Sequence, residues 1–548
     1  MNEGSITRRE WLATLALCAA ASIAATAWSW RNDALLNYGD AVAHLHIARR
    51  IFDSHRPGLE QLGSVWLPLP HLLLLPFVLK FSWWANGLAG VFPSALAYLA
   101  GCAGSYRLAR RWMGRKESAV ALAFFATNPN LLYLQTTAMT EPLFVCEMIW
   151  AVVWLVEWRA GLDADKDEWS GVNLPGRSSG RLLWQIAIVL VAAIFTRYDG
   201  WMMALLAWVG IGLALLRRGG LRSWAFWSAS VLVVAAPAAW CIYNAVAFGD
   251  WLTFLRGPYS AAAIELRTAA PGGPPHPGWH DPWVSLLFFV KVSEMDVAAG
   301  AWGNALLVLS ACGAAWGGLV ARTRAYRWTL LLWLPIPFYA YSVAYGAVPI
   351  FLPAWWPHSW YNTRYGLEML PALALGAGLA AHFVLTGLRA HQPAWTKFAA
   401  GIFFLLIAAN GWLVLREHPL VYVEGTKNIE SRRALEQEIP PAMRALLAER
   451  PGGVVLMNTS VFPNLVAFTG IPLKQTLNES DKEFYRDALA APAEHAALVL
   501  AFDGDEIAQA VQANPRGLRL VQRFTAKGQP SGALYVSDTS GSTTPPSR

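Results

Sequence analysis

The chain has 548 residues, of which 55% are hydrophobic and only 14% are charged, with a mean hydropathy of +0.34. Soluble domains carry about a quarter charged residues, so this composition excludes an ordinary soluble enzyme and indicates a polytopic protein surrounded by membrane lipids. The formal net charge of +7 is expected from Arg and Lys in cytoplasmic loops. It therefore indicates no nucleic-acid partner.

Apolar runs predict about eleven membrane-spanning helices, each near the ~20 residues that cross the hydrocarbon core. They lie near residues 11–30, 86–106, 118–134, 140–157, 182–197, 200–216, 224–246, 301–321, 328–348, 366–388 and 397–415. With the N-terminus inside, the cytoplasmic loops hold more Arg and Lys than the longer outer loops, as the positive-inside rule requires. An odd number of spans then puts the C-terminal region outside. Our expected location is a bacterial inner membrane, in which that side is the periplasm. Residues 8–30 also fit a cleaved signal peptide, which would leave this orientation unchanged.

The first outer loop begins with NYGDAVAHLHIARRIFDS (37–54), which predicts an amphipathic helix. Apolar residues recur at helical spacing on one side, and polar residues line the other. The apolar residues are Ala41, Leu45, Ala48 and Phe52, and the polar residues are His46, Arg49 and Asp53. Such a helix is expected to lie flat on the bilayer. Asp40 and His44 are four residues apart and are therefore neighbours on it.

The same loop continues with LPLPHLLLLPFVLKFSWW (67–84), which predicts a second juxtamembrane or re-entrant segment. Pro68, Pro70 and Pro76 are expected to break a helix here. Counting the segment as a span would place the Arg-rich residues 107–116 outside, against the positive-inside rule.

The polar C-terminal region predicts a small α/β domain over residues 416–536, attached to the helical membrane domain of residues 1–415. The fold class is therefore mainly α, with a polytopic helix bundle and a small periplasmic α/β domain. The predicted elements are strands at 454–458 and 497–502, helices at 430–449 and 481–491, and a hairpin of 518–524 with 533–537. The tail, 537–548, is expected to be disordered.

Candidate functional residues gather at the predicted outer ends of the helices. They are Asp40, His44, His71, Glu141, Arg197, Asp199, His358, Arg364 and Tyr365. The helix centres carry few charges, whereas charges at mid-membrane would mark a translocation path. One charged face rimmed by aromatic residues predicts a site at the membrane–water boundary.

Each of these residues also has a purely structural interpretation. Asp40 could cap the helix that follows it, and Glu141 stands at a helix start, where the dipole favours a carboxylate. Arg197 could simply pair with the carboxylate two residues on. Arg364 could snorkel to the interface, and His44 could be an interfacial histidine. The convergence of these residues on one side is the stronger signal.

The order of the motifs resembles that of GT-C polytopic glycosyltransferases, near the protein mannosyltransferase and aminoarabinose transferase branch. The resemblance spans about residues 10–390. The motifs are NYGDAVAHLHIARRIFDS, WLPLPHLLLLP, an Arg-rich turn, TTAMTEPLF, TRYDGW and RYGLEMLPALALGAG. It implies an enzyme that takes a sugar from a polyprenyl-phosphate carrier on the non-cytoplasmic face.

By resemblance, Asp40 is the essential acid of the first loop, Glu141 the second acidic position and Arg364 the basic residue that faces the carrier phosphate. Two departures are visible. Family members often carry a basic residue just before the Pro-rich segment, where this chain leaves only His71 nearby. Ala41 follows Asp40, in place of the second acid of the mannosyltransferases.

The chemistry predicts the same roles, because a polyprenyl-phosphate sugar already carries a good leaving group. The reaction needs a base for the acceptor hydroxyl and positive charge for the departing phosphate. We expect Asp40 to be the base, with inversion at the anomeric carbon. Arg364 is the expected phosphate clamp, and Arg197 is a second candidate. Glu141 and His44 would orient the acceptor, or hold a divalent metal cation if one is used; no other cofactor is indicated.

Two other classes of function stay open. A transporter or flippase of lipid-linked sugars would show internal repeats and polar groups near the midplane, and neither is visible in the sequence. A non-catalytic scaffold would use its outer domain to bind an envelope partner. The sequence leaves open whether the sugar is a hexose or a pentose, and whether the acceptor is a lipid, a glycan or a protein.

Overall fold

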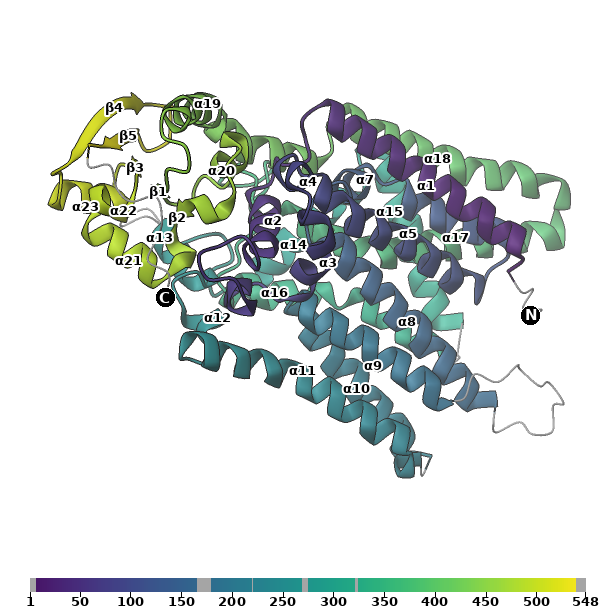
Figure 1. The fold of residues 1–548 in the computed structure, drawn as a ribbon. Coiled ribbons are helices and arrows are strands. Elements are labelled where there is room, and N and C mark those ends of the chain that lie inside the picture. The colour runs from purple at the N-terminus through teal and green to yellow at the C-terminus, as the bar shows by residue number, and fades with distance from the viewer. Residues whose placement is uncertain (1–5, 165–178, 219, 269–274, 321–323, 539–548) are drawn as a thin grey trace.

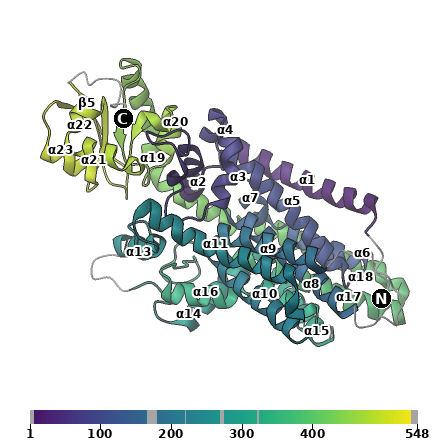
Figure 2. The same cartoon turned by 60° about the horizontal axis from the view of Figure 1, so that its bottom comes forward.

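The computed structural model describes residues 6–164, 179–218, 220–268, 275–320 and 324–538. Figure 1 shows a bundle of long helices with a smaller α/β unit at one end, and Figure 2 shows the same two parts from a second direction. The chain is thus a multi-pass membrane protein with the predicted fold class. The predicted disordered tail lies, from residue 539 on, outside the described residues.

Within the described ranges, seven helices are long and apolar enough to cross a membrane. They are α1 (Arg8–Arg31), α5 (Leu88–Arg110), α9 (Ser179–Thr196), α10 (Asp199–Leu216), α11 (Trp224–Phe248), the helix Thr363–His391 that contains α17 (Leu370–His391), and the helix Pro393–Glu430 that contains α18 (Thr396–Arg416). A bent pair of helices raises the number to eight. The predicted number of about eleven spans stays a prediction.

The bent pair includes a helix that the sequence analysis missed. Residues 247–300 read as one outer loop, but they contain α12 (Thr253–Arg256), α13 (Ala261–Thr268) and α14 (Pro282–Val297). Helix α14 meets α15 (Gly300–Val320) at an angle of 113°. Lys291, Glu294 and Asp296 interrupt its apolar pattern, which hid the helix in the sequence.

Two of the predicted spans are broken in the structure. Residues 118–134 form α6 (Arg115–Ala126) and the short α7 (Pro129–Leu134), and the Asn128 side chain caps α7. Residues 328–348 form the 3₁₀ helix η3 (Tyr326–Trp333) followed by α16 (Pro335–Tyr345). By contrast, α8 (Glu141–Ala164) is continuous and includes the predicted span 140–157.

Helices α15 and α17 pack so closely that their backbones touch at glycine. A Cβ atom on Gly313 would lie 2.1 Å from the carbonyl oxygen of Gly376, and one on Gly376 would lie 2.2 Å from the carbonyl oxygen of Ser310. Small residues commonly permit such approaches between membrane helices. Helix α17 is thereby held at the centre of the bundle, and the residues just before it carry part of the polar cluster described below.

This contact predicts that Gly313→Ala destabilises the protein, by about 1–3 kcal/mol as for other overpacked sites. The matched control is Gly318→Ala on the same helix, because a Cβ there meets nothing within 4 Å and Ala favours the helix. Thermal unfolding in detergent, followed by tryptophan fluorescence, should show a lower midpoint for Gly313→Ala alone. Equal midpoints would contradict the close packing.

The polar side predicted for the helix of the first outer loop, formed by His46, Arg49 and Asp53, is buried, so the prediction that it faces solvent is wrong. That the helix lies along the bilayer stays a prediction. Helix α2 (Gly39–Arg50) is buried on both sides: Ala41 and Leu45 are buried, and so are His46 and Arg49 from the predicted polar side. Helix α2 packs against α3 (Leu69–Val78) and α4 (Phe81–Ala85), which follow it in the same loop, and against the C-terminal region. His46 and Arg49 therefore face protein rather than solvent, whereas Asp40 in the first turn of α2 stays partly exposed.

The Pro-rich segment forms short helices, as a juxtamembrane segment requires, because the ten residues of α3 are too few to cross the bilayer. The prolines do not act as predicted, however. Pro68 and Pro70 stand at the start of α3, where proline is favoured, and Pro76 lies inside the helix without ending it.

The C-terminal region contains the predicted strands and hairpin in one five-stranded sheet, in the order β2-β1-β3-β5-β4. The strands are β1 (Val455–Met457), β2 (Thr476–Leu477), β3 (Leu498–Phe502), β4 (Leu518–Phe524) and β5 (Gly532–Ser537). Strand β1 is parallel to β2 and β3, whereas β5 is antiparallel to β3 and β4. The helices are α19 (Leu420–Ala448), α20 (Asn464–Thr469), α21 (Glu483–Ala490), α22 (Pro492–His495) and α23 (Glu506–Ala513).

Polar contacts fasten this sheet region to the first outer loop. The Asp53 carboxylate pairs with Arg49 at 2.6 Å and also accepts the backbone N–H groups of Leu473 and Lys474, both at 3.3 Å. The His55 ring contacts the Thr476 carbonyl oxygen at 2.9 Å. Figure 1 shows α2 between the bundle and the α/β unit.

Candidate active site

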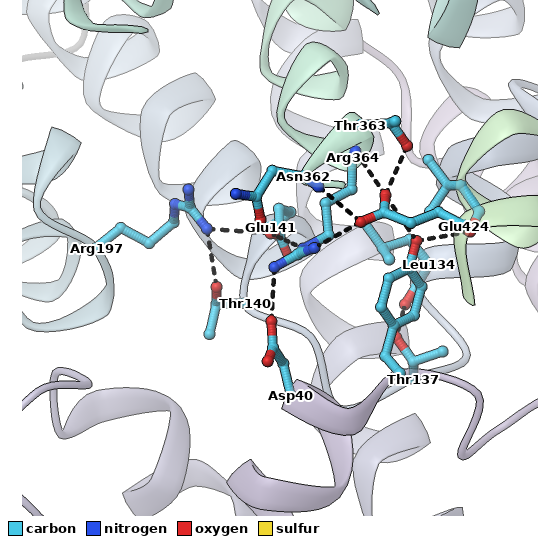
Figure 3. Close-up of polar contacts among 12 residues, drawn as sticks. Asp40, Leu134, Thr137, Thr140, Glu141, Arg197, Asn362, Thr363, Arg364 and Glu424 are labelled. Carbon is cyan, nitrogen blue, oxygen red and sulfur yellow. Dashed lines mark hydrogen bonds and ion pairs between the residues drawn. The ribbon is translucent and has the colours of Figure 1, made fainter. Parts of the chain in front are cut away.

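The polar cluster centres on Arg364, which lies in the 3₁₀ helix η4 (Thr363–Met369) just before α17. Its three guanidinium nitrogens contact three carboxylates from three different helices. Nη2 donates to Asp40 Oδ2 at 2.7 Å, Nε to Glu141 Oε1 at 3.0 Å and Nη1 to Glu424 Oε1 at 3.0 Å. Figure 3 shows the guanidinium among these three groups. Arg364 is only 5% exposed, so it does not snorkel.

Helix α2 presents Asp40 to this arginine from its first turn. The N-cap residue of α2 is Tyr38, so Asp40 does not cap the helix. The side chain of Asp40 is 44% exposed, while those of Glu141 and Glu424 are 1% and 0% exposed. Only Oδ2 bonds to Arg364, and no bond to Oδ1 is found among the described residues. The cluster therefore has one carboxylate that opens to solvent.

A second arginine, Arg197, lies beside the first and shares a carboxylate with it. Glu141 Oε1 accepts from Arg197 Nη1 at 3.1 Å as well as from Arg364. The ring of Tyr365 lies near both guanidinium groups, with its centroid 4.9 Å from the guanidinium carbon of Arg197 and 5.1 Å from that of Arg364. Cation–π contacts of this kind stabilise buried guanidinium groups.

The two arginines differ in how many N–H groups are engaged. An arginine has five N–H donors. Arg197 donates four hydrogen bonds, to Thr140 Oγ1, Glu141 Oε1, Asp199 Oδ2 and the Tyr339 hydroxyl, and forms an ion pair with Glu368 Oε1 at 3.2 Å. Arg364 makes three such bonds within the described structure, so one N–H on each Nη nitrogen remains for another acceptor.

This difference separates the two arginines by their room for an additional anion. An anion that approaches Arg197 must displace one of its acceptors, whereas Arg364 can bind an anion while keeping all three carboxylates. Arg364 thus has N–H groups left for a further acceptor, whereas those of Arg197 are engaged with residues that include Glu141, Asp199 and Tyr339.

Three predicted site residues lie outside the cluster. His44 Nδ1 is 2.8 Å from His71 Nε2, and the His44 ring packs on Trp66 with centroids 4.6 Å apart. Burial lowers the pKa of His44 to about 4 and the pKa of His71 well below its usual value, so both rings are neutral at pH 7. His358 is exposed, with its Nδ1 3.0 Å from the Pro353 carbonyl oxygen.

Two carboxylates of the cluster were not predicted. Glu368 is fully buried one turn after Arg364, and Tyr339 donates to its Oε1 at 2.7 Å. It stands inside a predicted span, and a charged residue in such a place is a functional signal. Glu424 comes from α19, sixty residues further along the chain, and carries no sequence signal of its own.

The donor set does not fit a preformed metal centre. Glu141 Oε1 is occupied by the two arginines, and His44 is directed at His71. In the part of the chain that the structure describes, no three His, Cys, Asp or Glu side chains are arranged to hold a metal ion.

The charges of the cluster are carried by two guanidinium groups and five carboxylates, those of Asp40, Glu141, Asp199, Glu368 and Glu424.

The chain was compared with protein-family models, curated proteins and solved structures. No family model and no curated protein matches it. A solved structure that is similar is ArnT from Cupriavidus metallidurans bound to undecaprenyl phosphate, with 14% identity, 99% of this chain and 100% of that chain covered, and a TM-score of 0.55. The Archaeoglobus fulgidus oligosaccharyltransferase in its apo form matches at 12% identity over 98% of this chain and 76% of that one, with a TM-score of 0.49.

The likeness to ArnT extends over nearly the full length of both chains, so it includes the helix bundle and the C-terminal region together. At 14% identity, this likeness shows the fold alone. The resemblance predicted from the order of the motifs is confirmed at that level: this chain has the fold of the polytopic GT-C glycosyltransferases.

Proposed function

We propose that the protein is a membrane glycosyltransferase that moves a hexose or pentose from a polyprenyl-phosphate-linked donor to an acceptor at the periplasmic face of a bacterial inner membrane. One observation carries the proposal. Asp40, the only carboxylate of the five that is open to solvent, lies 2.7 Å from an arginine that retains two N–H groups for an anion. The similar ArnT structure holds undecaprenyl phosphate, which supports a lipid-linked donor.

The geometry supports a single displacement. As the acceptor oxygen attacks the anomeric carbon, Asp40 Oδ1 takes the hydroxyl proton. The bond between that carbon and the phosphate oxygen breaks, and the polyprenyl phosphate leaves with its negative charge. The spare N–H groups of Arg364 stabilise that charge. Attack from the side opposite the leaving group predicts inversion, by the logic that governs inverting glycosidases.

The remaining residues of the cluster fix the positions of Asp40 and Arg364 relative to each other. Glu141 Oε1 bridges the two arginines, and the Tyr365 ring is within cation–π distance of both guanidinium groups. The ion pair between Asp40 Oδ2 and Arg364 orients the carboxylate and leaves Oδ1 for the acceptor. Arrangements of this kind hold reacting groups in a productive geometry, which contributes much of the rate in transferases.

The test is to reconstitute the full-length protein in nanodiscs with a panel of polyprenyl-phosphate-linked hexoses and pentoses and with lipid, glycan and peptide acceptors. We expect release of polyprenyl phosphate together with a glycosylated product, both measured by mass spectrometry, for at least one pair. Movement of intact donor between the leaflets of proteoliposomes, without a new glycosidic bond, would instead identify a flippase. Labelling that places residue 40 on the cytoplasmic side would also overturn the proposal.

A further inference from the structure

The C-terminal helix α19 inserts a carboxylate into the cluster. Glu424 lies in the first turns of α19 and is fully buried. Its Oε1 accepts the backbone N–H of Asn362 at 2.8 Å and Arg364 Nη1 at 3.0 Å. Its Oε2 accepts the Thr363 hydroxyl at 2.6 Å and the backbone N–H of Arg364 at 3.3 Å. Figure 3 shows these contacts converging on Glu424.

Glu424 therefore holds both the backbone and the side chain of Arg364. The turn that it holds includes Asn362 in the left-handed region, with a φ of +56°, which few residues other than glycine and asparagine adopt. A residue in this left-handed region persists where the surrounding structure fixes it. The carboxylate supplies such a constraint, since its two oxygens accept from three consecutive residues.

The same end of α19 also contacts the start of α2. The Tyr38 hydroxyl donates to the Val421 carbonyl oxygen at 2.6 Å and lies 3.3 Å from Glu424 Oε2. The residue after Glu424 is glycine, and a Cβ there would lie 3.0 Å from both the Tyr133 hydroxyl and the Tyr38 ring. Gly425 thus lets α19 come close to the residue that precedes the Asp40 turn.

We propose that Glu424 is a positioning residue of the active site, through which the C-terminal region sets the geometry of Arg364. The inference rests on the proposed function and deepens it. The outer domain is then an integral part of the catalytic unit, because the helix that leads into it fixes the arginine that binds the carrier phosphate.

The test is Glu424→Gln, with Glu117→Gln as the matched control. Both glutamates are fully buried and pair with an arginine near an end of α17, Glu424 with Arg364 and Glu117 with Arg389. The 22 residues of α17 place the two ends about 33 Å apart. Gln cannot replace Glu424, since both of its oxygens face donors and the amide NH₂ would oppose one set.

We expect Glu424→Gln to lower kcat/KM for the donor by about 10²-fold, as a misplacement of about 1 Å does, while Glu117→Gln keeps the wild-type value. Glu424→Asp should restore part of the loss. If Glu424 acts through Arg364, its substitution should have little further effect in an Arg364→Lys background, because coupled residues are not additive. Additive losses would indicate a merely structural role.

Amide hydrogen exchange measures how firmly Glu424 holds the turn before α17, and it does not depend on enzymatic activity. The backbone N–H groups of residues 362 and 364 should exchange faster in Glu424→Gln and not in Glu117→Gln. If Glu424→Gln and Glu117→Gln show the same exchange rates at residues 362 and 364 and the same kcat/KM, while the wild type is active, the positioning role is overturned. The proposed function then stands. If the wild type transfers no sugar from any donor, the proposed function fails, and the exchange data still decide whether Glu424 fixes the turn.

Discussion

Replacing Asp40 with Asn should lower the rate of sugar transfer by about 10²–10⁴-fold, the range that general bases contribute, and leave binding of the carrier lipid intact. Asn keeps an oxygen that can accept from Arg364 Nη2, so the arginine stays in place. The side chain is 44% exposed, and ion pairs at such positions contribute little to stability. The measurements are single-turnover transfer rates and, separately, the affinity for polyprenyl phosphate.

The matched control for this substitution is Asp33→Asn in the same loop. Asp33 is exposed and has a φ of +51°, a conformation that Asn adopts readily. It should transfer sugar like the wild type, which would show that the loss at position 40 belongs to that carboxylate. Transfer by Asp40→Asn at the wild-type rate would remove Asp40 as the base.

The site residues predicted from the sequence are those that a local pattern of charged and apolar residues reveals. Asp40, Glu141, Arg197 and Arg364 stood out as charges beside apolar runs, and the structure joins all four through ion pairs. Their roles as base and clamp stay predictions. The strands of the C-terminal region were visible because buried parallel strands read as continuous apolar runs, as VVLMN (454–458) does.

The pattern of residues along the sequence could not reveal features that depend on contacts between distant segments of the chain. Helix α2 has the amphipathic spacing of a surface helix, yet His46 and Arg49 on its polar side pack against Trp84. Asp53, just after the helix, accepts hydrogen bonds from residues more than four hundred positions later. Glu424 was missed for the same reason, since it belongs to a polar helix and meets Arg364 only in the folded chain. Glu368, in contrast, was visible as a charge within an apolar span and should have been singled out.

Replacing Arg364 with Lys should weaken the affinity for polyprenyl phosphate and lower kcat/KM by about 10–100-fold, because each charge-assisted hydrogen bond contributes roughly 1.5–3 kcal/mol. Lys keeps a positive charge among the buried carboxylates. It has three donors on one nitrogen, too few to hold the three carboxylates and a phosphate together. Arg364→Ala is a poorer test, since uncompensated buried charges cost about 3–5 kcal/mol and unfolding would obscure the loss of binding.

Two matched variants separate phosphate binding from general damage to the fold. Arg389→Lys alters the other end of α17, where the arginine pairs with Glu117, and should bind the carrier like the wild type. Arg197→Lys disturbs an arginine that already makes four hydrogen bonds and an ion pair with Glu368, so it should affect stability more than carrier affinity. If Arg364→Lys binds polyprenyl phosphate as tightly as Arg389→Lys, Arg364 is not the clamp. A larger loss of affinity in Arg197→Lys would transfer that role to Arg197, which would then have to release a carboxylate when the donor binds.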